Sequence, residues 1–209
     1  MKYFYHFLMV ISLLQPLELM AESEKKILKI AVLYDEEFLL HNTGLNHPEN
    51  PNRITHTINF LKKDYAFKSN LIWPSFGYAP LDVIKLVHSE KYINLVKQES
   101  ESLNKSIATL STGDTVISEK SYQVARKSVG AMTEGIDQIM EGKASSAFAF
   151  TRPPGHHAFK DKGMGFCIFN NVAIAAKYLQ DKYGIKRILI VDFDVHHGNG
   201  TQDIFYSDN

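Results

Sequence analysis

The sequence predicts an α/β fold, a parallel sheet flanked by helices, and three observations support that prediction. Short runs of aliphatic and β-branched residues alternate with segments whose apolar residues recur every three or four positions. Two of the runs, 146–151 and 188–191, are joined through one helical segment, which is the βαβ arrangement whose strands are parallel. The 209 residues are 44% hydrophobic, enough for the core of one domain.

The N-terminal stretch differs from the rest and has the layout of a secretory signal peptide. Lys2 precedes an apolar run too short to cross a bilayer, and Ala21 is a small residue at the expected cleavage point, although Leu19 does not match the pattern. A strand or helix packed on the domain is the alternative. We therefore expect 1–21 to be a signal peptide that directs export to the periplasm or outside, with a cytoplasmic protein as the alternative, and 22–209 to be the folded domain.

Composition limits the partners of this domain. The 23 basic and 23 acidic residues balance, so no overall charge attracts nucleic acid or an anionic membrane. Cys167 is the single cysteine, which excludes an internal disulfide and any metal motif built from several cysteines. We expect Cys167 to be a small buried hydrophobic residue.

The first half of the domain is expected to hold two strands and three helices. Residues 27–34 form the first strand, and Pro51, at a position where a missing amide costs nothing, begins a helix. A short strand at 71–73 is followed by two short helices, 80–88 and 89–98. The helix after Pro51 buries one apolar face, made of Ile54, Ile58 and Leu61.

A polar loop at 100–118 then leads into a longer helix at 118–141, which Gly142 ends. The helix has a stripe of apolar residues at helical spacing, which predicts one buried face. That stripe consists of Tyr122, Ala125, Val129, Met132, Ile136 and Ile139.

The last part of the chain is predicted to form a βαβ unit. A strand at 146–151 is followed by a loop at 152–169, a helix at 170–183 that Gly184 ends, and a buried strand at 188–191. Parallel strands of one sheet place their carboxyl ends at the same edge, where ligands bind in open α/β sheets. The loop after the first strand and the residues after the second therefore converge.

Two acids and a histidine follow the second strand at alternate positions. Asp192, Asp194 and His196 would project to one side of extended backbone. Carboxylate and imidazole ligands without thiolates suit zinc, and Asp194 with His196 is the best pair. The alternative is an aspartate that caps a turn beside a surface histidine, but a second histidine pair at the same edge favours the metal site.

That second pair is His156–His157, which follows Pro153-Pro154-Gly155, a sequence that restricts the backbone of the loop. Adjacent histidines can act as a hydrogen-bond donor and a general base, if each has a partner on its far nitrogen. Asp192 and Asn199 are the available partners. An aspartate would raise the pKa of its histidine, whereas an asparagine can only fix the tautomer.

Together these motifs resemble the zinc-dependent histone deacetylase superfamily. The resemblance rests on RPPGHHA, GFCIFNN and VDFDVHHGNGTQ, supported by HPENPNRI, which is similar to the class II branch, and by VHSEKYINLV. It runs from about Lys26 to the C-terminus. It implies an arginase/deacetylase-like α/β fold and one of three related activities, those of lysine deacetylases, acetylpolyamine amidohydrolases and acetoin-utilisation proteins.

The resemblance also implies cofactors and roles. Asp194 and His196 correspond to two of three zinc ligands, His157 to the general base and His156 to its partner. Asp192 would orient His156, while Asn199 stands where the class II branch has asparagine. A structural K⁺ would bind the backbone carbonyls of Asp192, Asp194 and His196.

Three further residues are matched to substrate binding. Gly165 and Phe166 correspond to the wall of the channel around the acyl-lysine stem, although a loop glycine with a core aromatic would give the same pattern. Asp114 corresponds to a rim residue that holds the substrate backbone, and a solvated loop aspartate is the alternative.

The chain departs from the family pattern at its end, since family domains continue past the point matched by Asn209. The third zinc ligand and the carbonyl-polarising tyrosine lie in that continuation, so we expect a sheet incomplete on its C-terminal side. The expected function is a zinc-dependent deacetylase acting on acetyl-lysine or a related acetylated amine. The alternatives are a truncated or degenerate, non-catalytic chain and an acetylpolyamine amidohydrolase.

Overall fold

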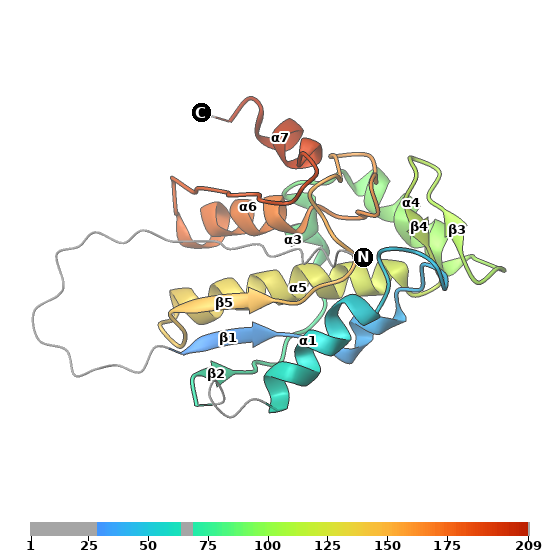
Figure 1. The fold of residues 1–209 in the computed structure, drawn as a ribbon. Helices are drawn as coiled ribbons and strands as arrows, with labels where there is room; N and C mark the ends of the chain where they lie inside the picture. The colour runs from blue at the N-terminus through green and yellow to red at the C-terminus, as the bar shows by residue number, and fades with distance from the viewer. Residues whose placement is uncertain (1–28, 64–68, 209) are drawn as a thin grey trace, which may run out of the picture.

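A computed structural model of the chain describes residues 29–63 and 69–208 (Figure 1). Its main sheet has three parallel strands in the order β2-β1-β5. They are β1 (Ile30–Leu33), β2 (Leu71–Ile72) and β5 (Ser146–Ala149). The three strands confirm the predicted ones, in shorter form, and the proposed signal peptide at 1–21 lies outside the described residues.

Helices cover the sheet as expected. α1 (Asn52–Lys63), α5 (Ser121–Met140) and α6 (Asn171–Tyr183) correspond to the three longest predicted helices. α5 contacts β1, β5 and α6 (Figure 1). Gly135 lets α5 lie close to the sheet, because a Cβ there would be 3.0 Å from the Cβ of Ala147.

The region between β2 and α5 was predicted only in part. α3 (Leu81–Lys85) and α4 (Glu90–Glu101) confirm the two short helices. The loop predicted at 100–118 instead contains a small antiparallel hairpin, β3 (Ala108–Thr109) with β4 (Val116–Ile117). Two-residue strands are too short to show an alternating pattern, so the sequence did not reveal them. A 3-10 helix, η2 (Glu36–Leu40), was also not predicted.

The predicted buried strand at 188–191 was wrong. This segment is in neither described sheet and runs from α6 toward α7 (Asn199–Phe205) (Figure 1). Its residues Leu189 and Val191 are 65% and 51% exposed. Ile188 packs against the cluster around Leu179 of α6, whereas Leu189 and Val191 are mostly exposed. A parallel strand needs cover on both faces, and the described residues supply it on one. The βαβ unit therefore stops after its helix.

Burial of the core agrees with the sequence in most other respects. Cys167 is fully buried, as expected, and Phe169 packs edge-on against Tyr92 and Tyr122. Within the described residues, no helix is both long and apolar enough to span a bilayer.

Candidate histidine and metal site

Two segments deliver the candidate residues to one place. The tandem histidines lie in the loop at 152–169, between β5 and α6, and the acidic residues lie in the segment that leads to α7. Asn170 ties these parts together, because its side chain caps α6 at Ala173 N and donates to Ala158 O at 3.0 Å and to Thr201 Oγ1 at 3.2 Å. The structure thus brings together the residues that the sequence placed at one sheet edge, even though the second strand is absent.

Each tandem histidine has the partner expected for it. His156 Nδ1 lies 2.8 Å from Asp192 Oδ2, and His157 Nδ1 lies 2.6 Å from Asn199 Oδ1. The two imidazole centroids are 4.0 Å apart. Gly198 leaves room for the first pair, since a Cβ there would be 2.5 Å from Asp192 Oδ2.

The hydrogen bonds define the tautomer of His157. The backbone N–H of Gly200 donates to Asn199 Oδ1 at 3.1 Å, so the oxygen of that amide faces the ring and His157 Nδ1 must donate to it. Nε2 is then the unprotonated nitrogen of the neutral ring. Burial lowers the pKa of His157, as do the neighbouring His156 and His196, while the Asn199 hydrogen bond opposes the shift. A neutral imidazole with its basic nitrogen available suits a proton acceptor near neutral pH.

Asp194 and His196 are adjacent, as a shared metal ion requires. Asp194 Oδ2 lies 3.0 Å from His196 Nδ1 and 3.9 Å from His156 Nε2, and a pocket of about 780 Å³ opens beside the pair. Ligand atoms about 2.0–2.2 Å from a tetrahedral zinc would be roughly 3.4 Å apart, so these two atoms, which lie at hydrogen-bond distance, would separate by a few tenths of an ångström to hold the ion. The His196 ring is 71% exposed, which leaves it accessible. Within 29–63 and 69–208, no three His, Cys, Asp or Glu side chains form a metal-binding group.

The residues matched to substrate binding lie against His157. Gly165 and Phe166 both have a positive φ, at 54° and 70°, and a Cβ on Gly165 would be 2.4 Å from His157 Cδ2. Only glycine fits there, because the position combines left-handed backbone with contact to the ring. Asp114 accepts a hydrogen bond from Gly165 N at 2.8 Å, so this exposed carboxylate holds the turn beside the histidine.

Sequence reasoning missed a buried ion pair and a rim histidine. Arg152 binds Glu49 in the interior, and His47 contacts the Phe166 ring edge-on, with centroids 4.5 Å apart. The Pro-rich motifs around Glu49 and Arg152 were noticed separately, but nothing in the sequence pairs positions 103 residues apart.

Comparisons with known proteins agree with this arrangement. The histone deacetylase domain family matches residues 47–209, and the chain belongs to that family. Its fold is shared with the crystal structure of the HDA15 HD domain, at a TM-score of 0.78 and 34% identity, covering 87% of this chain and 51% of that one. The predicted parallel sheet flanked by helices is confirmed at the level of the fold.

Relatives of known sequence extend the similarity. The chain is 42% identical over 176 residues to an uncharacterized protein of Synechocystis, covering 83% of this chain and 56% of that one. It is 39% identical over 169 residues to histone deacetylase 6 of Caenorhabditis elegans, covering 78% of this chain and 18% of that one. The chain therefore spans about half, or less, of the curated relatives that it matches.

Proposed function

We propose that this chain supplies the histidine pair and two zinc ligands of a deacetylase that hydrolyses the amide of acetyl-lysine or a related acetylated amine. The observation that carries the proposal is the pairing of His156 with Asp192 and of His157 with Asn199, beside Asp194. Membership of the histone deacetylase family supports a hydrolase. The identity of the substrate and the use of zinc are parts of the proposal.

Zinc, when bound by Asp194 and His196, supplies a Lewis acid that polarises an amide carbonyl and acidifies water. His157 Nε2 is the proton acceptor, because Asn199 fixes its other nitrogen as a donor. His156 is paired through Nδ1 with the Asp192 carboxylate, which fixes the orientation of its ring beside His157. The water oxygen bonds to the acetyl carbon, the C–N bond breaks, and the proton held by His157 passes to the departing amine.

Zinc binding and turnover test this proposal together. Equilibrium dialysis of the chain with zinc and hydrolysis of an acetyl-lysine peptide should both be positive. Asp194→Ala should weaken zinc binding at least about tenfold, as expected for removal of a ligand. Asp203→Ala is the matched control, because Asp203 is an exposed acid on α7 outside the cluster. His157→Ala should abolish turnover while leaving zinc bound, and full activity of this variant would refute the assignment of the base.

A non-catalytic role is the second candidate, and one observation favours it. Among the residues that the structure describes, Asp194 and His196 form a group of two, where catalytic zinc normally has three protein ligands. A chain that does not retain zinc and hydrolyses neither an acetyl-lysine peptide nor an acetylpolyamine would support a binding module with the deacetylase fold. Faster turnover of an acetylpolyamine than of an acetyl-lysine peptide would instead favour the small-amine activity. The K⁺ site at the backbone carbonyls of Asp192, Asp194 and His196 and the export of the protein stay predictions.

A further inference from the structure

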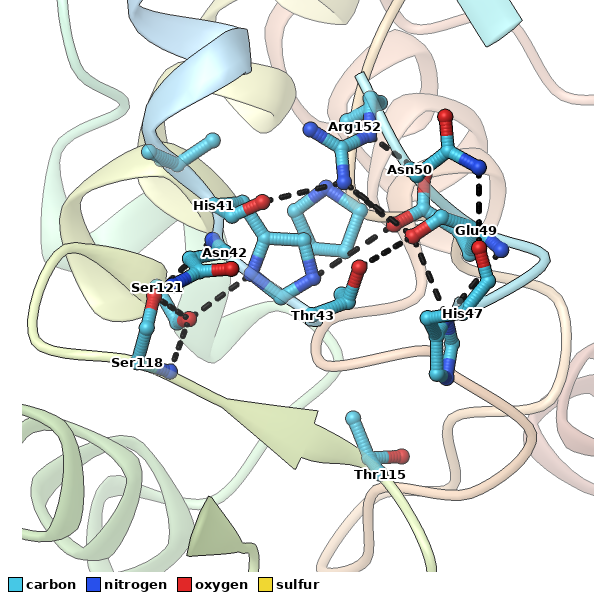
Figure 2. A network of polar contacts seen from close by, with 12 residues as sticks. His41, Asn42, Thr43, His47, Glu49, Asn50, Thr115, Ser118, Ser121 and Arg152 are labelled. Carbon is cyan, nitrogen blue, oxygen red and sulfur yellow. Dashed lines mark hydrogen bonds and ion pairs between the residues drawn. The ribbon is translucent and has the colours of Figure 1, made fainter. Parts of the chain in front are cut away.

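Arg152 is the centre of a buried polar network next to the candidate site (Figure 2). Its Nε and Nη2 donate to the two carboxylate oxygens of Glu49, at 2.6 and 2.8 Å. Nη1 donates to Phe38 O at 2.9 Å, and Nη2 also donates to His41 O at 3.0 Å. Every nitrogen of this planar fork is therefore used, in a geometry that a lysine could not reproduce.

The network joins two loops that are far apart in the sequence. Arg152 is the first residue of the loop that carries the tandem histidines, and Glu49 lies near the end of the loop at 41–50. Thr43 Oγ1 donates to Glu49 O at 2.5 Å, and Arg53 donates to Glu49 Oε1 at 2.9 Å. Arg152 thus fixes both ends of the 41–50 loop to the base of the histidine loop, one end through the carbonyl of His41 and the other through the Glu49 carboxylate (Figure 2).

The tip of the 41–50 loop contacts the residue matched to the channel wall. The backbone N–H of Glu49 donates to His47 Nδ1 at 3.1 Å and holds the ring, while Asn50 Nδ2 donates to the backbone carbonyl of His47 at 2.9 Å and holds the main chain behind it. That ring lies edge-on to Phe166, 4.5 Å between centroids. Phe166 follows Gly165, which packs on His157. A continuous set of contacts therefore runs from the buried ion pair to the mouth of the candidate site.

The charges of this network are balanced without help from solvent. Burial by itself would raise the pKa of the Glu49 carboxyl, but the hydrogen bonds and charge of Arg152, with the charge of Arg53, hold it below its usual value. Burial lowers the pKa of His41 to about 4, so this ring is neutral. A buried ion pair of this kind adds little net stability, and its best-supported use is to specify one arrangement of the chain.

We propose that the Glu49–Arg152 pair is a positioning element that holds His47 against Phe166 and thereby shapes the entrance to the candidate site. Neither residue touches reacting atoms. The consequence for substrate binding rests on the proposed deacetylase function, whereas the coupling of the two loops does not.

Cys167 makes the coupling measurable without activity. It is the single cysteine of the chain, it follows Phe166 directly, and it is fully buried, with His157 N donating to its sulfur at 3.4 Å. The rate of labelling by a thiol reagent reports how often this part of the loop opens. Glu49→Gln, which keeps the shape and removes the charge, should raise that rate at least about tenfold under native conditions, since it leaves the Arg152 charge buried without its partner.

Two controls separate positioning from general destabilisation. Glu90→Gln removes the carboxylate of an exposed ion pair, Lys85–Glu90, and should leave the labelling rate unchanged. Leu179→Ala weakens the buried core of α6 in a cluster that includes no residue of either loop, and should speed labelling only in denaturant, where global unfolding dominates. The proposal is overturned if Glu49→Gln labels within about twofold of the unaltered chain, or if Leu179→Ala reproduces its effect under native conditions.

Kinetics then test the link to the site. In an active protein, Glu49→Gln should raise KM for an acetyl-lysine peptide about tenfold with kcat within about threefold, because His156 and His157 keep their own partners. A fall in kcat at unchanged KM would overturn the assignment to the entrance. Absence of turnover in the unaltered chain would count against the deacetylase proposal alone, and the labelling result would still decide whether the two loops are coupled.

Discussion

His88 should make the protein lose stability when the pH falls from 7 to about 5. This ring is buried between the start of α4 and the loop at 152–169. Nδ1 lies 3.1 Å from Lys160 O and must donate to it, while Nε2 accepts the backbone N–H of Asn170 at 2.9 Å. A proton added at Nε2 would replace that acceptor with a second donor facing an N–H group, so the folded state strongly prefers the neutral ring.

The magnitude follows from the difference between the folded and unfolded states. Burial lowers the pKa of His88 from 6.5 to about 4. Between these two values the unfolded chain binds a proton that the folded chain does not, so the free energy of unfolding decreases as the pH falls. At about pH 5, this difference amounts to about 2 kcal/mol relative to neutral pH, and above about pH 7 it vanishes.

Urea unfolding followed by circular dichroism at several pH values measures this effect. His88→Gln has no titrating group, so its free energy of unfolding should fall about 2 kcal/mol less than that of the unaltered chain between pH 7 and 5. The buried His41 titrates in the same window, but it is present in both proteins and cancels. His56→Gln, which replaces an exposed histidine on α1, should follow the unaltered chain. Parallel curves for His88→Gln and the unaltered chain would refute the reasoning.

Three further substitutions have defined outcomes. Gly184→Ala places a side chain at a φ of 66° with no neighbour within 4 Å, so urea unfolding should show only the roughly 1 kcal/mol of left-handed strain. Gly165→Ala should reduce the free energy of unfolding by more than that, because its Cβ would also displace the His157 ring. Asn199→Ala should lower kcat for an acetyl-lysine peptide at least about tenfold, and an unchanged kcat would show that the amide does not orient His157. Glu49→Gln should reduce the free energy of unfolding by about 3 kcal/mol or more, because it leaves the buried Arg152 charge without its partner. A loss below about 1 kcal/mol would mean that water reaches the Arg152 guanidinium.

Local patterns in the sequence predicted those parts of the fold that local forces decide. Pro51 precedes α1, Gly184 ends α6 in the left-handed conformation, and the apolar stripe of α5 packs in the two clusters that α6 shares. The partners of His156 and His157 were predicted as well, because an aspartate and an asparagine follow the same short segment. Their roles in catalysis stay predictions.

Non-local packing accounts for the rest. Residues 188–191 have the composition of a buried strand, but a strand forms only where a neighbour offers its edge, and the apolar pattern says nothing of that neighbour. The ion pair between Glu49 and Arg152 depends on the meeting of two loops, which no periodicity encodes. The requirement for glycine at position 165 was not predictable either, because it comes from a left-handed backbone and from contact with the His157 ring, which belongs to another part of the loop.

The exposed apolar residues of the segment between α6 and α7 have a practical consequence for handling the protein. Leu189, Val191, Phe193 and Val195 stand at alternate positions of this segment, and each is at least half exposed. Extended chain with an uncovered apolar face is a template on which other chains assemble. Because Asp194 and His196 belong to the same segment, self-association at high concentration would bury the metal ligands. Zinc titrations are therefore best made on dilute samples, with light scattering to verify that the protein is dispersed.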